Sequence, residues 1–186
     1  QEANPAGGHL AFLFTGQGSQ YEGMGKELYD KEEAFRAVMD RCDEALSGVL
    51  PHRLLDVLYG AAEDVRALVH NTQYAQPALF AIECATATLW RSKGWEPSVV
   101  LGHSVGEYAA ACMAGMMSIE SGAKLMAARG RLMSELPGGG SMVAVMASEL
   151  HSRYSRCRRG STSTPSRDRH RRSRHRSSKR MSPHKV

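Results

Sequence analysis

The feature that most constrains this chain is a short apolar segment that runs into a GxSxG sequence. Pro97 to Leu101 is typical of a buried strand, Gly102-His-Ser-Val-Gly106 follows at once, and Glu107 to Met117 is typical of an apolar helix. A GxSxG sequence between a strand and a helix favours a sharp turn that exposes the Ser104 hydroxyl at the strand's carboxyl end. There, the amide after the serine and the helix amino terminus can stabilise an oxyanion. The plainer alternative is a serine in an ordinary βα turn.

A second strand and glycine-rich loop lie near the amino-terminal end. Leu10 to Phe14 is apolar and predicts a buried strand. The glycine-rich loop Thr15-Gly-Gln-Gly-Ser-Gln20 follows it directly. Glycines here let the backbone approach a ligand closely. The loop has neither the Lys-Ser/Thr of a P-loop nor GxGxxG spacing, which disfavours a nucleotide-phosphate site. A flexible turn remains the plain alternative.

Helical periodicity fills the region between the two strands. One amphipathic helix has apolar residues at steps of three and four: Ala34, Phe35, Val38, Met39, Cys42 and Leu46. Leu54 to Leu58 is less regular, and a short helix is predicted near Val65 to Val69. Pro77 is expected to open a longer apolar helix that runs to about Lys93, with Gly94 just past its end. Strands separated by helices predict an α/β fold with a parallel sheet.

A further helix is predicted from Ser118 to Leu136, ended by Pro137-Gly-Gly-Gly140. At about 100° per residue, Arg129 falls in the middle of its apolar stripe. The stripe residues are Leu125, Met126, Leu132, Met133 and Leu136. An inward cation needs an anionic partner, since unpaired burial costs several kcal/mol. The plain alternative is that Arg129 pairs with an internal Asp or Glu or snorkels outward to solvent. The other is that it binds a substrate carboxylate, whose planar shape fits the guanidinium fork.

The carboxyl-terminal segment has a different composition from the rest. Ser141 to Ala147 predicts a third strand, after which residues 149–186 hold 11 Arg, 2 Lys, 4 His and 9 Ser but only two acids. These 38 residues carry a net charge of +11 and residues 1–148 a net charge of −6. We expect this tail to be disordered. It can bind nucleic acid nonspecifically through counterion release, but a reading-frame change that gives a non-native ending is the favoured interpretation.

Composition excludes several classes of protein. No run of about 18 apolar residues could span a bilayer, and no signal-peptide pattern follows Gln1. We therefore expect a soluble, cytoplasmic protein without membrane partners. The missing initiator Met favours a segment cut from a longer chain, although processing or cloning would also remove it. The cysteines form no CxxC pair, so we expect no metal site and no disulfide framework, with three of the four thiols in the core. They are Cys42, Cys84, Cys112 and Cys157.

Four ordered motifs resemble a known family. They are Gly16-Gln-Gly-Ser-Gln20, Thr72-Gln-Tyr-Ala-Gln-Pro-Ala-Leu79, Gly102-His-Ser-Val-Gly-Glu107 and Ala128-Arg-Gly130. In this order they resemble the acyltransferase domain of polyketide and fatty acid synthases, the malonyl-CoA:acyl carrier protein transacylase family, and most of all a modular type I polyketide synthase domain. The resemblance implies a linker at residues 1–9 and an amino-terminal, partial acyltransferase domain at residues 10–148.

The resemblance implies roles for matching residues. Ser104 is the nucleophile that takes a malonyl-type group from malonyl-CoA as an ester and passes it to the phosphopantetheine thiol of an acyl carrier protein. Arg129 holds the free carboxylate of that group. No permanently bound cofactor is implied, and the partners are the carrier protein and a neighbouring ketosynthase domain in the parent synthase.

The remaining implied roles surround the acyl group. The backbone amides of Gln17 and Val105 form the oxyanion hole, while Gln76 and His103 line the acyl site. An apolar residue at the position of Val105 goes more often with malonyl than with methylmalonyl units in this family. The extender unit, the polyketide product and the particular carrier protein stay open.

The departures from the family are equally specific. No histidine here matches the catalytic His, and none of those in the tail has its context: His151, His170, His175 and His184. The resemblance implies the partial α/β-hydrolase-like large subdomain, with the ferredoxin-like small subdomain essentially missing. Little activity is therefore expected. Two other classes stay open: a GxSxG serine esterase, and a nucleic-acid-binding protein that relies on the basic tail.

Overall fold

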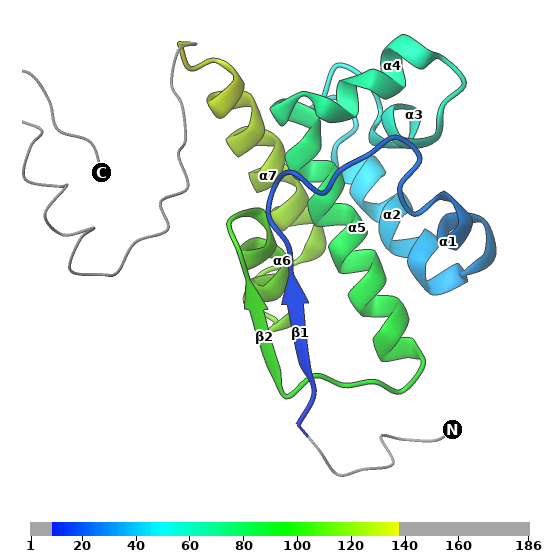
Figure 1. Ribbon diagram of the computed structural model, residues 1–186, viewed down its shortest axis with the longest axis vertical. Helices are drawn as coiled ribbons and strands as arrows, with labels where there is room; N and C mark the ends of the chain where they lie inside the picture. Colours follow the sequence, from blue (N-terminus) through cyan, green and yellow to red (C-terminus); the bar gives the residue numbers. More distant parts are fainter. Residues whose placement is uncertain (1–8, 138–186) are drawn as a thin grey trace, which may run out of the picture. The chain divides into compact units, whose positions relative to one another are not determined.

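The computed structural model describes residues 9–137, and the predicted strand at Ser141 to Ala147 and the basic tail lie outside them. Helices dominate the described part, which contains a single small sheet (Figure 1). In chain order the elements are β1 (Ala11–Phe14), α1 (Lys26–Lys31), α2 (Glu33–Ala45), α3 (Leu54–Tyr59), α4 (Glu63–Ala67), the 3₁₀ turn η1 (Leu68–His70), α5 (Thr72–Ser92), β2 (Val99–Gly102), α6 (Val105–Met113) and α7 (Ile119–Ser134).

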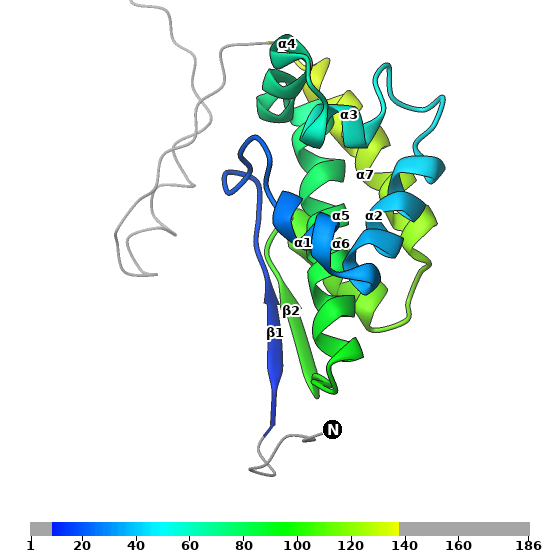
Figure 2. The ribbon, with the colours of Figure 1, turned by 90° about the vertical axis from the view of Figure 1, so that its right-hand side faces the viewer.

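The sheet confirms the predicted α/β class with parallel strands. β1 and β2 pair in parallel, with Phe12 opposite Val100 and Phe14 opposite Gly102. Their carboxyl ends therefore lie side by side, which brings the two glycine-rich loops to the same edge of the sheet. Viewed from the side, the strands of residues 9–137 lie along one side of the helical layer (Figure 2).

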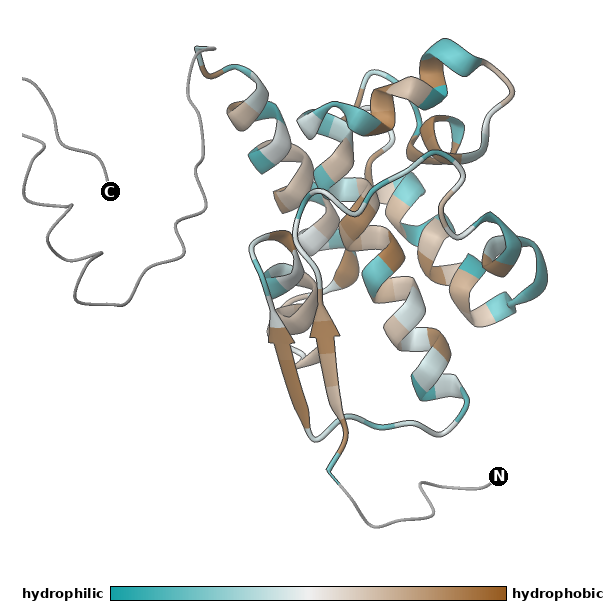
Figure 3. Cartoon of the chain, viewed as in Figure 1, coloured by the Kyte–Doolittle hydropathy of each residue, from teal (hydrophilic) through white to brown (hydrophobic). Residues whose placement is uncertain are grey.

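One face of the sheet is bare within the described part of the chain. Leu13, Val99 and Leu101 are 73%, 56% and 63% exposed, and both strands are strongly apolar in Figure 3. Parallel sheets are normally covered on both faces. The helices flank one face alone, so within residues 9–137 the other, apolar face of the sheet is uncovered.

Helix α5 is the centre of the helical layer and contacts α2, α6 and α7. The predicted amphipathic helix is confirmed as α2, whose inward residues Phe35 and Met39 are fully buried. They meet Phe80 of α5 and Met126 of α7 in one continuous apolar core. No described helix is both long and apolar enough to cross a membrane.

The predicted start of α5 is wrong. The helix begins at Thr72 and not at Pro77, because the Asn71 side chain caps it by accepting a 2.9 Å hydrogen bond from the Gln73 amide. Pro77 has no N–H, so the Gln73 carbonyl lacks its usual partner inside the helix. That carbonyl packs against Gly130 of α7, where an added Cβ would lie 3.0 Å from it. The proline and the glycine together let α5 and α7 approach closely.

Three cysteines line the core, as expected: Cys42, Cys84 and Cys112 are buried and free. Burial raises the pKa of the Cys42 thiol to about 12, so it stays protonated and chemically quiet. Cys157 lies outside the described residues.

A buried carboxylate ties α2 to α3 and gives a stability prediction. Asp43, 3% exposed, accepts hydrogen bonds from the Leu55 amide at 3.1 Å and from Arg53 Nε at 2.9 Å. We expect Asp43→Ala to lower the free energy of unfolding by about 3 kcal/mol, because it leaves both donors without their acceptor. Glu44→Ala is the matched control, since this exposed residue also meets Arg53 and should cost under about 0.5 kcal/mol. Equal urea midpoints for the two variants would contradict this assignment.

Candidate active site

Ser104 occupies the sharp turn that the sequence predicts. It lies between β2 and α6 with φ 55° and ψ −109°, and it is the one non-glycine residue with positive φ among residues 9–137. An L-residue adopts such a conformation at an energetic cost, and strain of this kind gathers at functional sites. The turn projects the hydroxyl beyond the sheet edge, directly before the amino terminus of α6.

The two glycines of the GxSxG sequence are sterically required. A Cβ on Gly102 would lie 2.2 Å from the backbone of Gly106. A Cβ on Gly106 would lie 2.4 Å from the carbonyl oxygen of Phe14, at the end of β1. The turn therefore packs backbone against backbone, and this contact sets the position of Ser104 relative to the loop after β1.

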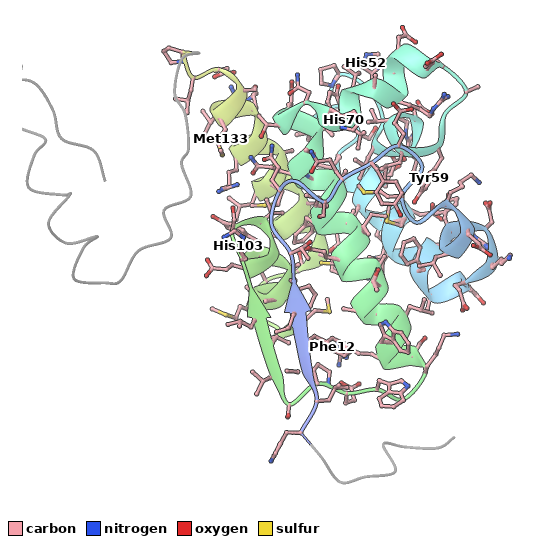
Figure 4. All side chains as sticks on the ribbon, in the orientation of Figure 1. Phe12, His52, Tyr59, His70, His103 and Met133 are labelled. Carbon is pink, nitrogen blue, oxygen red and sulfur yellow. The ribbon has the colours of Figure 1, made fainter. Side chains whose placement is uncertain are left out.

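The glycine-rich loop after β1 lies against the same turn. A Cβ on Gly16 would lie 2.5 Å from Nδ1 of His103, so this imidazole packs directly on the loop. His103 is visible at the carboxyl end of β2 in Figure 4. Within the described residues, neither the Gln17 amide nor the Val105 amide donates a hydrogen bond. Both amides predicted to form the oxyanion hole are thus unengaged.

A chain of hydrogen bonds joins all four motifs. Thr72 Oγ1 donates to Gln17 Oε1 at 2.9 Å, and Gln76 Nε2 donates to Thr72 Oγ1 at 3.2 Å. Arg129 Nη1 then donates to Gln76 Oε1 at 2.5 Å, and its Nη2 donates to Ser104 Oγ at 3.4 Å. Side chains from the first loop, α5, α7 and the serine turn therefore form one polar cluster.

The setting of Arg129 differs from the predicted one. It is half-buried at the border of the packed face of α7, whereas Leu125 and Leu132 of the supposed stripe are exposed. The packed face consists of small residues and one methionine: Gly122, Ala123, Met126, Ala127 and Gly130. Periodicity misplaced the stripe because glycine and alanine count little as apolar residues, yet they set how closely α7 can approach α5.

No ion pair joins Arg129 to a carboxylate within the described part of the chain. Its neighbours are instead neutral: Gln76, Ser104, and the ring of Tyr108, whose centroid lies 5.8 Å from the guanidinium carbon. The internal Asp or Glu considered as a partner is therefore not found among residues 9–137. No carboxylate of the described residues therefore neutralises this cation beside the serine.

Sequence reasoning missed three residues of this cluster. Thr72 connects Gln17 to Gln76, and Tyr108 lies beside Arg129. Met133, labelled on α7 in Figure 4, has its Sδ 3.2 Å from Gln76 Nε2. Thr72 stands at the start of the second motif, which was the available signal. The other two sit four residues after Ser104 and after Arg129, on the same helix faces, a spacing that pointed to them.

None of the described histidines is positioned as a general base for Ser104. His9, His52, His70 and His103 are described, and none of them hydrogen-bonds Ser104. The described residues also contain no group of His, Cys, Asp and Glu that could hold a metal ion. The histidines of the tail lie outside the described residues.

A parallel α/β sheet with a serine on a strand-to-helix elbow, unengaged amides and a nearby cation is the architecture of a serine-dependent acyl-transfer domain. The family described as "Acyl transferase domain" matches residues 11–162, and the chain belongs to this family. The match includes the first part of the basic segment.

Named relatives agree with this assignment. The chain is 47% identical over 140 residues to PKS-NRPS hybrid synthetase acdB of Aspergillus candidus, covering 75% of this chain and 6% of the relative. It is 46% identical over 144 residues to mycoketide-CoA synthase of Mycobacterium tuberculosis, covering 77% and 3%. The chain therefore spans a small part of the curated relatives it matches.

Solved structures show the same fold. The acyl transferase domain of ZmaA superposes with a TM-score of 0.68 at 38% identity, covering 74% of this chain and 32% of that one. The malonyl CoA-acyl carrier protein transacylase from Clostridium perfringens gives a TM-score of 0.62 at 35% identity, covering 69% and 38%. This chain spans about a third of each solved structure.

Proposed function

We propose that the chain carries the nucleophile side of a transacylase that moves a malonyl-type group from coenzyme A to an acyl carrier protein in polyketide or fatty acid biosynthesis. The observation that carries this proposal is the hydrogen-bond chain from Gln17 through Arg129 to Ser104. It supports a site that combines a serine, an amide-lined loop and a guanidinium that has no ion pair among residues 9–137. Those are the three groups that acyl transfer from a carboxylate-bearing thioester requires.

The first step forms an ester. Ser104 Oγ attacks the thioester carbonyl carbon and loses its proton to a base, and the carbonyl oxygen becomes an oxyanion that accepts hydrogen bonds from the Gln17 and Val105 amides. Collapse breaks the C–S bond, and coenzyme A leaves as a thiol once its sulfur takes up a proton. In the second step the phosphopantetheine thiol of the carrier protein attacks the ester, and Ser104 regains its proton.

Arg129 is the residue that selects an acyl group with a free carboxylate. Its guanidinium fork fits a carboxylate in two hydrogen bonds, and the malonyl carboxylate would replace the long contact to Ser104. Gln76 holds the guanidinium in place, and His103 lines the site beside it. Val105 after the serine favours malonyl over methylmalonyl within this proposal.

The proposal extends to the parent protein. The described part is the beginning of an α/β-hydrolase-like large subdomain, and its bare sheet face is where the rest of that subdomain packs. Residues 1–9 are the linker from a preceding ketosynthase domain of a cytoplasmic modular synthase. No histidine among residues 9–137 hydrogen-bonds Ser104, and the chain is proposed to lack a general base for this serine.

A missing base predicts slow turnover. With malonyl-CoA and a phosphopantetheinylated carrier protein, we expect the chain to transfer malonyl at a rate at least about 100-fold below that of a complete acyltransferase domain, because general-base catalysis contributes about 10²–10⁴-fold. Added imidazole should raise the rate in proportion to its free-base concentration. The measurement is malonyl-carrier protein formed over time, followed by mass spectrometry.

Two controls sharpen this experiment. Ser104→Ala should remove both the slow and the imidazole-stimulated transfer. A rate equal to that of a complete domain without imidazole would overturn the missing-base proposal. Hydrolysis of neutral esters with no preference for malonyl thioesters would instead favour the serine esterase.

A further inference from the structure

A carboxyl group that is not part of the hydrogen-bond chain at Ser104 contacts the first residue of the glycine-rich loop after β1. Thr15 Oγ1 donates a 2.9 Å hydrogen bond to Glu83 Oε1, which projects from α5. Thr15 is the first residue after β1 and the first of the glycine-rich loop. The same hydroxyl lies 3.2 Å from Ser19 Oγ, and Ser19 Oγ donates to the Gly16 carbonyl at 3.4 Å. These contacts bracket Gln17 on both sides.

Glu83 is an unfavourable residue for its location. It lines a groove of about 510 Å³ between β1 and α5 whose other walls are almost wholly apolar, including Phe12, Trp90 and Trp95. Its Oε2 is buried with no hydrogen-bond partner among the described residues. An apolar side chain of similar size would avoid the cost of about 1–3 kcal/mol for an unsatisfied buried polar atom. Stability therefore does not explain a carboxyl group here, whereas its bond to Thr15 does.

The surroundings raise the pKa of this carboxyl into the neutral pH range. Burial raises the pKa of Glu83 to about 7, against the opposing effect of the hydrogen bonds from Thr15. Glu83 is the one acidic or basic residue among those that line the groove on β1, the loop and α5. The adjacent titratable group is the Cys84 thiol, whose pKa is raised by its hydrogen bond with Cys112 and by burial, so it stays neutral.

We propose that Glu83 is a positioning residue for acyl transfer: through the Thr15 hydroxyl it fixes the loop from Thr15 to Ser19 and so holds the Gln17 amide where the oxyanion develops. This inference rests on the proposed function. Burial raises the pKa of Glu83 from its ordinary value of 4.5 to about 7, so the closed loop favours the protonated acid. Opening the loop to water lowers this pKa again, and loop order is therefore lost as pH rises from about 4.5 to about 7.

Hydrogen exchange of the full chain tests this without substrate. The measure of loop protection is the Gly18 amide, which donates a 2.8 Å hydrogen bond to Gln20 Oε1. In Glu83→Leu we expect the protection factor of this amide to fall about threefold, while the urea midpoint stays equal or rises. In the wild type, protection corrected for intrinsic exchange should fall several-fold between about pH 5 and pH 7. In Glu83→Gln it should not vary with pH. Thr15→Val removes the donor and should reproduce the loss, whereas Glu33→Gln, at an exposed site on α2, is the control.

If Glu83 only stabilised the fold, its replacement would lower the urea midpoint and the loop protection together. A loss of loop protection without a loss of stability therefore identifies Glu83 as a positioning residue. Unchanged loop protection in both Glu83→Leu and Thr15→Val would overturn the inference. The same variants are then treated with malonyl-CoA, where the rate of Ser104 ester formation should fall about tenfold. Wild-type ester formation in Glu83→Leu would also overturn it. If no variant, including the wild type, forms the ester while loop protection responds as expected, the proposed function fails and the loop assignment stands.

Discussion

Replacing Arg129 with alanine is expected to erase the preference of Ser104 for malonyl-CoA over acetyl-CoA. The guanidinium is half-buried, carries no ion pair within residues 9–137 and reaches the serine hydroxyl. Losing one partner of a desolvated, hydrogen-bonded charge pair costs about 2–5 kcal/mol, which at the lower end is roughly 30-fold in rate. We expect malonyl ester formation to fall about 100-fold and acetyl ester formation to change less than about threefold.

Arg131→Ala is the matched control for this prediction. Arg131 lies on the same helix, but it is exposed and pairs with Glu135 at 2.8 Å. Its removal should leave both esterification rates unchanged. Arg129→Lys keeps the charge without the two-pronged fork and should fall between wild type and alanine. Equal losses with malonyl-CoA and acetyl-CoA in Arg129→Ala would show that the arginine supports the turn and does not recognise a carboxylate.

Replacing Gly106 with alanine is expected to cause a large loss of stability, because the elbow leaves no room for a methyl group at this position. The new Cβ would lie 2.4 Å from the Phe14 carbonyl oxygen and 2.5 Å from the Thr15 carbonyl oxygen. Both are backbone atoms at the end of β1, so neither can rotate away. We expect the free energy of unfolding to fall by about 3 kcal/mol or more, as in severe overpacking.

Urea denaturation followed by circular dichroism measures this loss. Glu107→Gln is the control at the next position, where the side chain is exposed and the change should stay within about 0.5 kcal/mol. If Gly106→Ala fails to accumulate as folded protein while Glu107→Gln does, the steric account also holds. An alanine variant with a wild-type urea midpoint would contradict the backbone contact between the elbow and β1.

Elements with strong periodic signals were predictable from the sequence. Short apolar runs predict the two strands, and apolar residues at steps of three and four predict α2. The GxSxG sequence between a strand and a helix predicts the elbow at Ser104. The start of α5 was not predictable from Pro77, because an Asn71 cap that satisfies the first amides outweighs the usual preference of proline for a first turn. Six-residue α3 was missed because it has too few turns to establish a period.

The site was predictable where motifs mark it and not where tertiary contacts build it. Ser104, Arg129 and Gln76 stand in recognisable motifs, and the structure brings them together. Their assigned roles remain predictions. Thr72 and Glu83 matter through partners 55 and 68 residues away in sequence, Gln17 and Thr15. No local pattern encodes such pairs, since they depend on how α5 packs beside the loop after β1.

The most direct test of the central claim is peptide mapping after incubation with malonyl-CoA and imidazole. The account predicts a single malonyl ester on the peptide that contains Ser104, absent in Ser104→Ala and strongly reduced with acetyl-CoA as donor. A malonyl group found on lysines or cysteines alone, with the Ser104 peptide unmodified, would contradict the proposal that this elbow is the nucleophile of an acyl transferase.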